Sequence, residues 1–91
     1  MVAAPFESID DIAKVANDTP YGLGAGIWTR DISKAHALAK KIRAGTVWIN
    51  CYNIFDAALP FGGYKESGWG REMGHQALEA YTEVKSVCAQ L

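Results

Sequence analysis

The first fifty residues alternate between amphipathic helical patterns and short extended ones. Apolar residues recur three and four apart behind Ser8, which forms a capping-box pattern with Asp11, and "NDTP" at 17–20 ends this predicted helix. A second such pattern follows Asp31, with basic residues in its last turn and Gly45 expected in the left-handed conformation beyond it. The β-branched and aromatic runs "LGAGIWT" at 23–29 and "TVWIN" at 46–50 are predicted strands.

A strand, helix and strand joined by such short links predict a parallel pair with a right-handed crossover, so the fold class is α/β. After the glycine-rich loop, apolar residues with helical spacing between Met73 and Tyr81 predict a last helix. The final "VKSVCAQL" has strand character, and no neighbouring strand is evident for it in 91 residues. The expected order is helix, strand, helix, strand, glycine-rich loop, helix and a terminal strand.

Charge and apolar content narrow the classes of function. The net charge is −1, with lysines and arginines interspersed among acids, so we expect no nucleic-acid partner. No apolar run approaches the roughly 18 residues needed to span a bilayer, and the first residues lack a signal-peptide pattern. We therefore expect a cytoplasmic protein with no membrane partner. Cys51 and Cys88 have no C-x-x-C spacing, so we expect free thiols and no metal site.

The glycine-rich stretch "PFGGYKESGWGRE" at 60–72 raises the question of nucleotide binding. The spacing G-x-G-x-x-x-G from Gly68 to Gly74 is one residue longer than the dinucleotide fingerprint, and no strand directly precedes it. We therefore expect these glycines to allow positive φ and close packing, with no cofactor-binding residue among them. Cys51 follows a predicted strand, but neither histidine is placed to act as its base, so we expect a buried, unreactive thiol and no catalytic residue.

Five aromatic side chains surround the same loop, namely Trp48, Tyr52, Phe55, Phe61 and Trp69. Apolar walls with a few polar groups are what a small-molecule pocket requires. Large aromatic residues are equally characteristic of a core or of a subunit interface. The pattern alone leaves both interpretations open.

Three stretches together resemble a known family. In order and with similar spacing, "YGLGAGIWTRD", "AGTVWINCYNIFDAALPFGGYKESGWGREMG" and "EAYTEVKSV" resemble the C-terminal segment of the NAD(P)-dependent aldehyde dehydrogenase superfamily, from about Pro5 to the end. Residues 53–74 are most similar to members acting on arylacetaldehydes such as phenylacetaldehyde. The resemblance implies that residues 1–83 are the C-terminal part of an aldehyde dehydrogenase catalytic domain and residues 84–91 an oligomerisation strand.

The resemblance implies a parent enzyme that oxidises an aldehyde to a carboxylic acid with NAD or NADP. It places the family's cysteine nucleophile, its glutamate base and its nucleotide-binding domain before the first residue of this chain, and Cys51 does not match the nucleophile. The isolated chain is thus expected to be inactive and to bind no cofactor. The family's substrate-tunnel positions fall on Asn53, Phe55 and Phe61.

The resemblance also implies a subunit boundary near the end of the chain. The family positions at this boundary fall on Arg71, Glu83, Val84 and Val87, with Arg71 and Glu83 as a candidate charge pair. The implied partner is a second copy, in a dimer or tetramer, or the missing N-terminal part. The alternative is a non-catalytic module from a truncated gene that binds by strand addition. An upstream reading frame carrying the cysteine motif would favour the enzyme.

Overall fold

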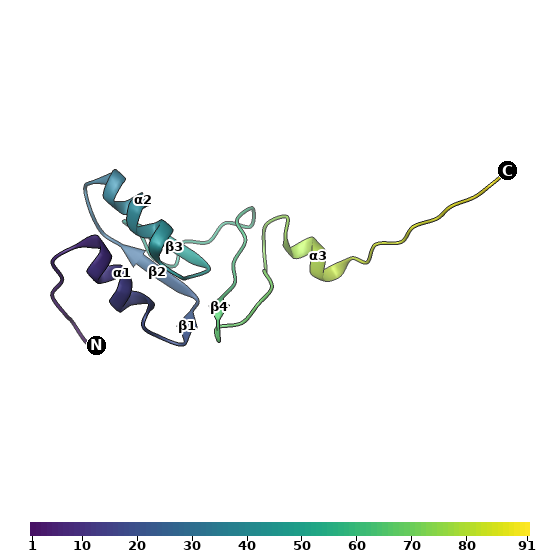
Figure 1. The fold of residues 1–91 in the computed structure, drawn as a ribbon. Helices are drawn as coiled ribbons and strands as arrows, with labels where there is room; N and C mark the ends of the chain where they lie inside the picture. Colours follow the sequence, from purple (N-terminus) through teal and green to yellow (C-terminus); the bar gives the residue numbers. More distant parts are fainter.

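The structure, a computed structural model, describes residues 1–91. The elements in chain order are α1 (Ile9–Asn17), β1 (Tyr21–Gly22), β2 (Gly24–Ile27), α2 (Ile32–Lys41), β3 (Thr46–Ile49), β4 (Tyr64–Lys65) and α3 (Ala77–Tyr81). Figure 1 shows α1 and α2 beside the β2 and β3 strands at one end of the molecule, with α3 and the last residues extending away from them. The molecule is therefore elongated, with extents of 70, 26 and 23 Å.

Both long helices begin at the side chains that the sequence indicates. The Ser8 hydroxyl accepts a hydrogen bond from the Asp11 amide at 3.1 Å, and the Asp31 carboxylate accepts one from the Lys34 amide at 3.0 Å. The reciprocal half of the capping box is not formed, because the Ser8 hydroxyl itself donates to the Asp11 carboxylate at 2.6 Å. One side-chain acceptor thus caps each helix, which satisfies one of its free amides.

The β2 and β3 strands form the predicted parallel pair, in register from Gly24 opposite Thr46 to Ile27 opposite Ile49. Gly24 is required here because a Cβ atom on it would lie 2.8 Å from the Trp48 ring. A second, antiparallel pair joins β1 to β4 and was not predicted. This pair brings the glycine-rich loop back against the start of β2. It was not predicted because a two-residue strand has too little hydrophobic pattern to be recognised in sequence.

Asn17 and Lys65 form a polar clasp that joins three segments distant in sequence. The Asn17 side chain accepts from the Arg43 amide at 2.7 Å and donates to the Lys41 carbonyl at 2.8 Å, which ties the end of α1 to the end of α2. The Lys65 ammonium donates to the carbonyls of Asn17 and Thr19 at 2.7 and 2.9 Å. The Asn17–Lys65 clasp therefore fixes β4 to both helix ends.

Two expectations about glycine have different outcomes. Gly68, Gly70 and Gly74 have φ of 113°, 83° and 62°, so the predicted positive φ is confirmed. Gly45 does not have the expected left-handed conformation, because α2 already ends at Lys41 and the following residue, Ile42, has an extended backbone. Gly45 instead lies directly against the Gly62 backbone, where any Cβ atom would overlap the Gly62 carbonyl oxygen. The absence of a side chain at Gly45 therefore allows the glycine-rich loop to pack closely against the residue before β3.

The C-terminal elements differ from the sequence prediction. The last helix spans only Ala77–Tyr81, because Met73 and Gly74 have left-handed φ values of 57° and 62° that interrupt the helical pattern before it. The expected strand at 84–91 is not formed within the chain. These residues are extended but have no neighbouring segment to supply backbone hydrogen bonds. An oligomerisation strand here stays a prediction.

The core is small for a chain of this length. Only six of 91 residues are buried, and four of them are apolar: Ala13, Ile27, Ala35 and Trp48. Many large apolar side chains are exposed, among them Phe6, Trp28, Ile32 and Trp69. Such surfaces typically contact another polypeptide. None of the helices has both the length and the apolar content to cross a membrane.

Candidate functional site

Five aromatic rings pack in series at the carboxyl ends of β2 and β3. In order these rings, the aromatic cluster, are Trp28, Tyr52, Trp48, Phe55 and Phe61, with centroid separations of 6.3, 4.8, 5.7 and 5.1 Å. The last two contacts are edge-to-face, at 87° and 84°, which is a favourable geometry for aromatic pairs. Four of the five rings that the sequence grouped around this loop therefore meet.

The composition of the cluster corrects the sequence prediction at one position. Trp69 is 98% exposed and takes no part, and Trp28 occupies the end of the series instead. The carboxyl ends of two parallel strands meet at one edge of the pair, so Trp28 after β2 comes close to Tyr52 after β3. The predicted pairing of the two strands could have indicated the contact between Trp28 and Tyr52. The sequence analysis missed it because it grouped only aromatic residues that are close in sequence.

Asn50 fixes the chain where it leaves β3. It has a positive φ of 55°, and its side-chain amide accepts from the Thr29 amide and donates to the Thr29 carbonyl, both at 2.9 Å. The turn after β3 is thereby joined to the residues after β2. This pair of hydrogen bonds holds together the two segments that carry Trp28 and Tyr52, and the sequence analysis did not identify Asn50 as a positioning residue.

Three rings of the aromatic cluster, those of Trp48, Phe55 and Phe61, line a cavity of about 250 Å³. Its apolar lining comes mainly from Trp48, Ile54, Phe55, Leu59, Phe61 and Met73. The structure thus brings together two of the three predicted substrate-binding residues, Phe55 and Phe61. Asn53 is exposed, has a φ of 55° and is not part of the lining. In this chain, the cavity is suited to an apolar or aromatic group rather than to a charged one.

Cys51 also lines the cavity, but it lacks the partners of a nucleophile. Its side chain is half-buried rather than buried as expected, and Cys88 is exposed. Neither His36 nor His75 lines the cavity, and the Asp56 carboxylate there accepts a hydrogen bond from the Ala58 amide at 2.8 Å. The structure contains no group of three or more His, Cys, Asp or Glu side chains suited to hold a metal ion. The residues of this chain that line the cavity therefore provide mainly an apolar binding surface.

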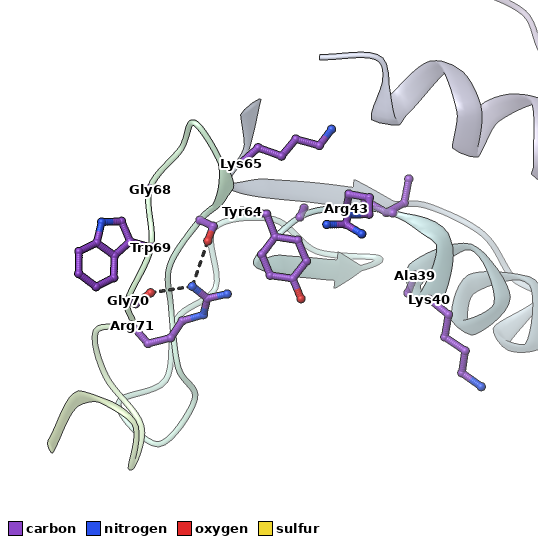
Figure 2. A pocket seen from close by; sticks show the side chains of 12 residues that line it. Ala39, Lys40, Arg43, Tyr64, Lys65, Gly68, Trp69, Gly70 and Arg71 are labelled. Atoms are coloured by element: carbon purple, nitrogen blue, oxygen red, sulfur yellow. Dashed lines mark hydrogen bonds between the residues drawn. The ribbon is translucent and has the colours of Figure 1, made fainter. Parts of the chain in front are cut away.

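Arg71, a predicted interface residue, lies in a second and wider groove of about 860 Å³ between α2 and the glycine-rich loop. Figure 2 shows its guanidinium directed at backbone carbonyls, with hydrogen bonds of 3.0 Å to Gly63 and 2.6 Å to Gly70. Arg71 and Arg43 both lie over the Tyr64 ring, at 5.5 and 5.8 Å from its centroid. The Arg71 contacts therefore stay within the glycine-rich loop, and the contact of Arg43 with Tyr64 joins this loop to the end of α2.

The predicted charge pair between Arg71 and Glu83 is not formed within the chain. The two ion pairs in the structure join Lys34 to Asp31 and Lys41 to Asp10. Glu83 is exposed, and Val84 and Val87 are exposed to 97% and 85%. The residues after α3 extend away from the other elements (Figure 1), so Glu83 has no neighbour of opposite charge. An interface role for these residues stays a prediction.

Comparison with known proteins identifies the family. The model of the aldehyde dehydrogenase family matches residues 1–87, so the chain belongs to this family, as the sequence resemblance predicted. DhaS of Bacillus subtilis (strain 168), named as a candidate aldehyde dehydrogenase, is 57% identical over 91 residues, which are all of this chain and 18% of that protein. The chain thus spans less than a fifth of the length of this relative.

Solved structures agree with this assignment. The NAD⁺ complex of an aldehyde dehydrogenase from Bacillus cereus superposes with a TM-score of 0.87 and 57% identity, over 92% of this chain and 17% of that one. The P. syringae indole-3-acetaldehyde dehydrogenase AldA, in complex with NAD⁺ and IAA, superposes with a TM-score of 0.86 and 48% identity, over 94% of this chain and 17% of that one. The α/β arrangement described above is therefore that of the corresponding part of aldehyde dehydrogenases.

Proposed function

We propose that these residues form the C-terminal part of the catalytic domain of an NAD(P)-dependent aldehyde dehydrogenase, which oxidises an aldehyde to a carboxylic acid. Their contribution is a wall of the substrate tunnel. The observation that carries this proposal is the edge-to-face pair of Phe55 and Phe61, 5.1 Å apart on the lining of the apolar cavity. Family membership supports the proposed reaction, and the apolar lining of the cavity supports a substrate-contacting role for these residues.

The residues present do not fit the dinucleotide cofactor. Gly68 and Gly70 face open space, with no atom within 4 Å of a Cβ built on either, and the following helix has only five residues. A pyrophosphate site needs a strand, a tight turn and a helix N-terminus in direct succession. We therefore propose that the cofactor is bound by residues of the parent enzyme outside this chain. We assign no step of hydride transfer to the residues of this chain.

The chain's own residues act on the aldehyde by binding and orientation. Phe55 and Phe61 present ring edges and faces that contact an apolar substituent and keep water from it. Asn53, at the third tunnel position, lies outside the cavity of the isolated chain. We assign it to the tunnel mouth of the parent, as a polar group near the substrate.

An arylacetaldehyde such as phenylacetaldehyde is the proposed substrate class. Aromatic pairs gain about 0.5–1.5 kcal/mol beyond their buried area, so a wall of aromatic rings favours an aryl group over an alkyl group of equal size. The P. syringae relative, named as an indole-3-acetaldehyde dehydrogenase, is consistent with this class.

The same proposal includes assembly. Residues 84–91 would add a strand to a sheet of a second subunit, giving a homo-oligomer in which Arg71, Glu83, Val84 and Val87 lie at the boundary. The extended backbone of this tail and the exposure of both valines support this role, because an unpaired extended segment readily forms a sheet with another chain. A binding module that acts only through strand addition would use the same tail, and it differs from an enzyme segment in lacking an upstream reading frame with the cysteine motif.

The experiment that tests the proposal replaces Phe61 or Phe55 by alanine in a full-length enzyme carrying these residues. We expect kcat/KM for phenylacetaldehyde to fall roughly 10- to 200-fold, since a lost apolar contact in a pocket is worth about 1–3 kcal/mol. The affinity for NAD(P)⁺ is expected to stay within twofold. A collapse of cofactor affinity with unchanged aldehyde preference would contradict the tunnel assignment.

A further inference from the structure

Trp48 connects the sheet to the loop that carries the proposed tunnel wall. It is the only aromatic residue in the core, with 8% of its surface exposed, and its ring contacts both Tyr52 and Phe55. Its indole N–H donates a hydrogen bond of 2.8 Å to the Ile54 carbonyl. We propose that Trp48 is a positioning residue for substrate selectivity, which sets the orientation of Phe55 through Ile54. This inference rests on the proposed function.

The backbone between Cys51 and Phe55 has no other hydrogen bond to hold it. None of the main-chain hydrogen bonds of the structure involves a residue of this stretch, and Phe55 is itself 51% exposed. The Trp48–Ile54 bond is thus the one hydrogen bond that fixes it. Because the peptide unit between Ile54 and Phe55 is planar, fixing the Ile54 carbonyl also fixes the direction in which the chain enters Phe55.

Phe61 is anchored independently of Trp48. Its amide and carbonyl exchange hydrogen bonds of 2.7 Å each with Glu72, which form an isolated antiparallel bridge. The two rings of the proposed wall therefore have separate supports, one from an indole N–H and one from the backbone. Loss of the indole N–H is expected to displace Phe55 and to leave the Phe61 backbone in place.

This separation distinguishes positioning from simple core packing. A residue that only fills the core would affect all substrates alike through stability. A residue that orients Phe55 affects aryl substrates selectively, and its effect depends on the Phe55 ring being present. A double-mutant cycle between positions 48 and 55 measures this dependence.

The test uses a full-length enzyme carrying these residues, assayed with phenylacetaldehyde and acetaldehyde. Trp48→Phe keeps an aromatic ring and removes the N–H donor. We expect KM for phenylacetaldehyde to rise about fivefold, the equivalent of one ordinary hydrogen bond, with kcat for phenylacetaldehyde within twofold of the parent value. The rise in KM for acetaldehyde is expected to be smaller but measurable, because Trp48 itself lines the cavity. In a Phe55→Ala background the same substitution is expected to change KM less than twofold. Trp69→Phe, which removes an indole that is 98% exposed, is the matched control.

The remaining outcomes distinguish a failure of the positioning role of Trp48 from a failure of the proposed tunnel wall. Equal losses for both aldehydes, or a full fivefold effect in the Phe55→Ala background, would overturn the positioning role of Trp48. If Phe55→Ala leaves aldehyde discrimination unchanged, the tunnel wall itself is wrong. If Phe55→Ala alters it and Trp48→Phe does not, only the role of Trp48 fails. Should Trp48→Phe not fold, 3-benzothienylalanine at position 48 preserves the shape, removes the N–H and carries the same expectations.

Discussion

Replacing Asn50 separates two contributions that one residue makes to the turn after β3. Asn50 makes two hydrogen bonds to Thr29, each 2.9 Å long, and it holds a φ of 55°. Both bonds are exposed to water, so each is expected to contribute near the lower end of the usual range, about 0.5 kcal/mol. Asn50→Gly removes the bonds and tolerates the positive φ, at a cost of about 1 kcal/mol in the free energy of unfolding. Asn50→Ala also loses both bonds and keeps a Cβ atom at that φ without the local hydrogen bonding that lets asparagine adopt it, so it is expected to cost about 1–2 kcal/mol more than Asn50→Gly.

The assay is urea unfolding of a full-length enzyme carrying these residues, at low micromolar concentration, followed by far-ultraviolet circular dichroism. We expect the transition midpoints to fall in the order parent, glycine variant, alanine variant. Equal midpoints for the two variants would show that the left-handed backbone carries no strain at this position. A glycine variant as stable as the parent would show that the hydrogen bonds to Thr29 contribute no more than the left-handed strain that Asn50 carries, and the expected loss of about 1 kcal/mol would be wrong.

Three further predictions concern activity, assembly and packing. The purified chain is expected to reduce neither NAD⁺ nor NADP⁺ with phenylacetaldehyde above a boiled control, and alkylation of Cys51 to change nothing; measurable turnover would refute this. In a full-length enzyme, deleting the residues after Val84 is expected to lower the oligomeric state measured by sedimentation. Glu83→Lys is expected to weaken assembly, because it places like charges at the subunit boundary. An intact oligomer in both variants would count against the interface. Gly45→Ala is expected to destabilise the chain by about 1–3 kcal/mol in urea unfolding, because its Cβ would overlap the Gly62 carbonyl; an unchanged midpoint would refute the close approach.

The elements with a strong local pattern were predictable from sequence. The α1 and α2 helices follow from their apolar spacing and from the caps at Ser8 and Asp31, and the parallel β2–β3 pair follows from the short links around α2. The two-residue strands β1 and β4 were missed, since their pairing depends on contacts between residues more than forty positions apart. The length of the last helix was overestimated, because left-handed Met73 cannot be distinguished in sequence from a helical apolar residue.

The candidate site was predictable in its composition but not in its geometry. The aromatic density around the loop identified Phe55 and Phe61 as neighbours, and the structure places them in contact. The same density could not separate Trp69, which points to solvent, from Trp28, which joins the cluster from the end of β2. Direction of a side chain from a loop depends on backbone φ, and the positive values at Gly68 and Gly70 on either side of Trp69 have no local sequence signal beyond glycine itself.

The Asn17–Lys65 clasp has a consequence for the order of folding events. It joins residues 48 positions apart, whereas paired residues of β2 and β3 are 22 positions apart. Loop-closure entropy rises with the logarithm of loop length, so closing the clasp directly costs about 0.7 kcal/mol more than closing the β2–α2–β3 unit. The strand–helix–strand unit therefore has the entropic advantage as a nucleus, and the clasp is made on a chain that it has already shortened. Hydrogen bonds formed this late act on the unfolding rate, so the clasp determines how long the folded chain persists more than how fast it forms.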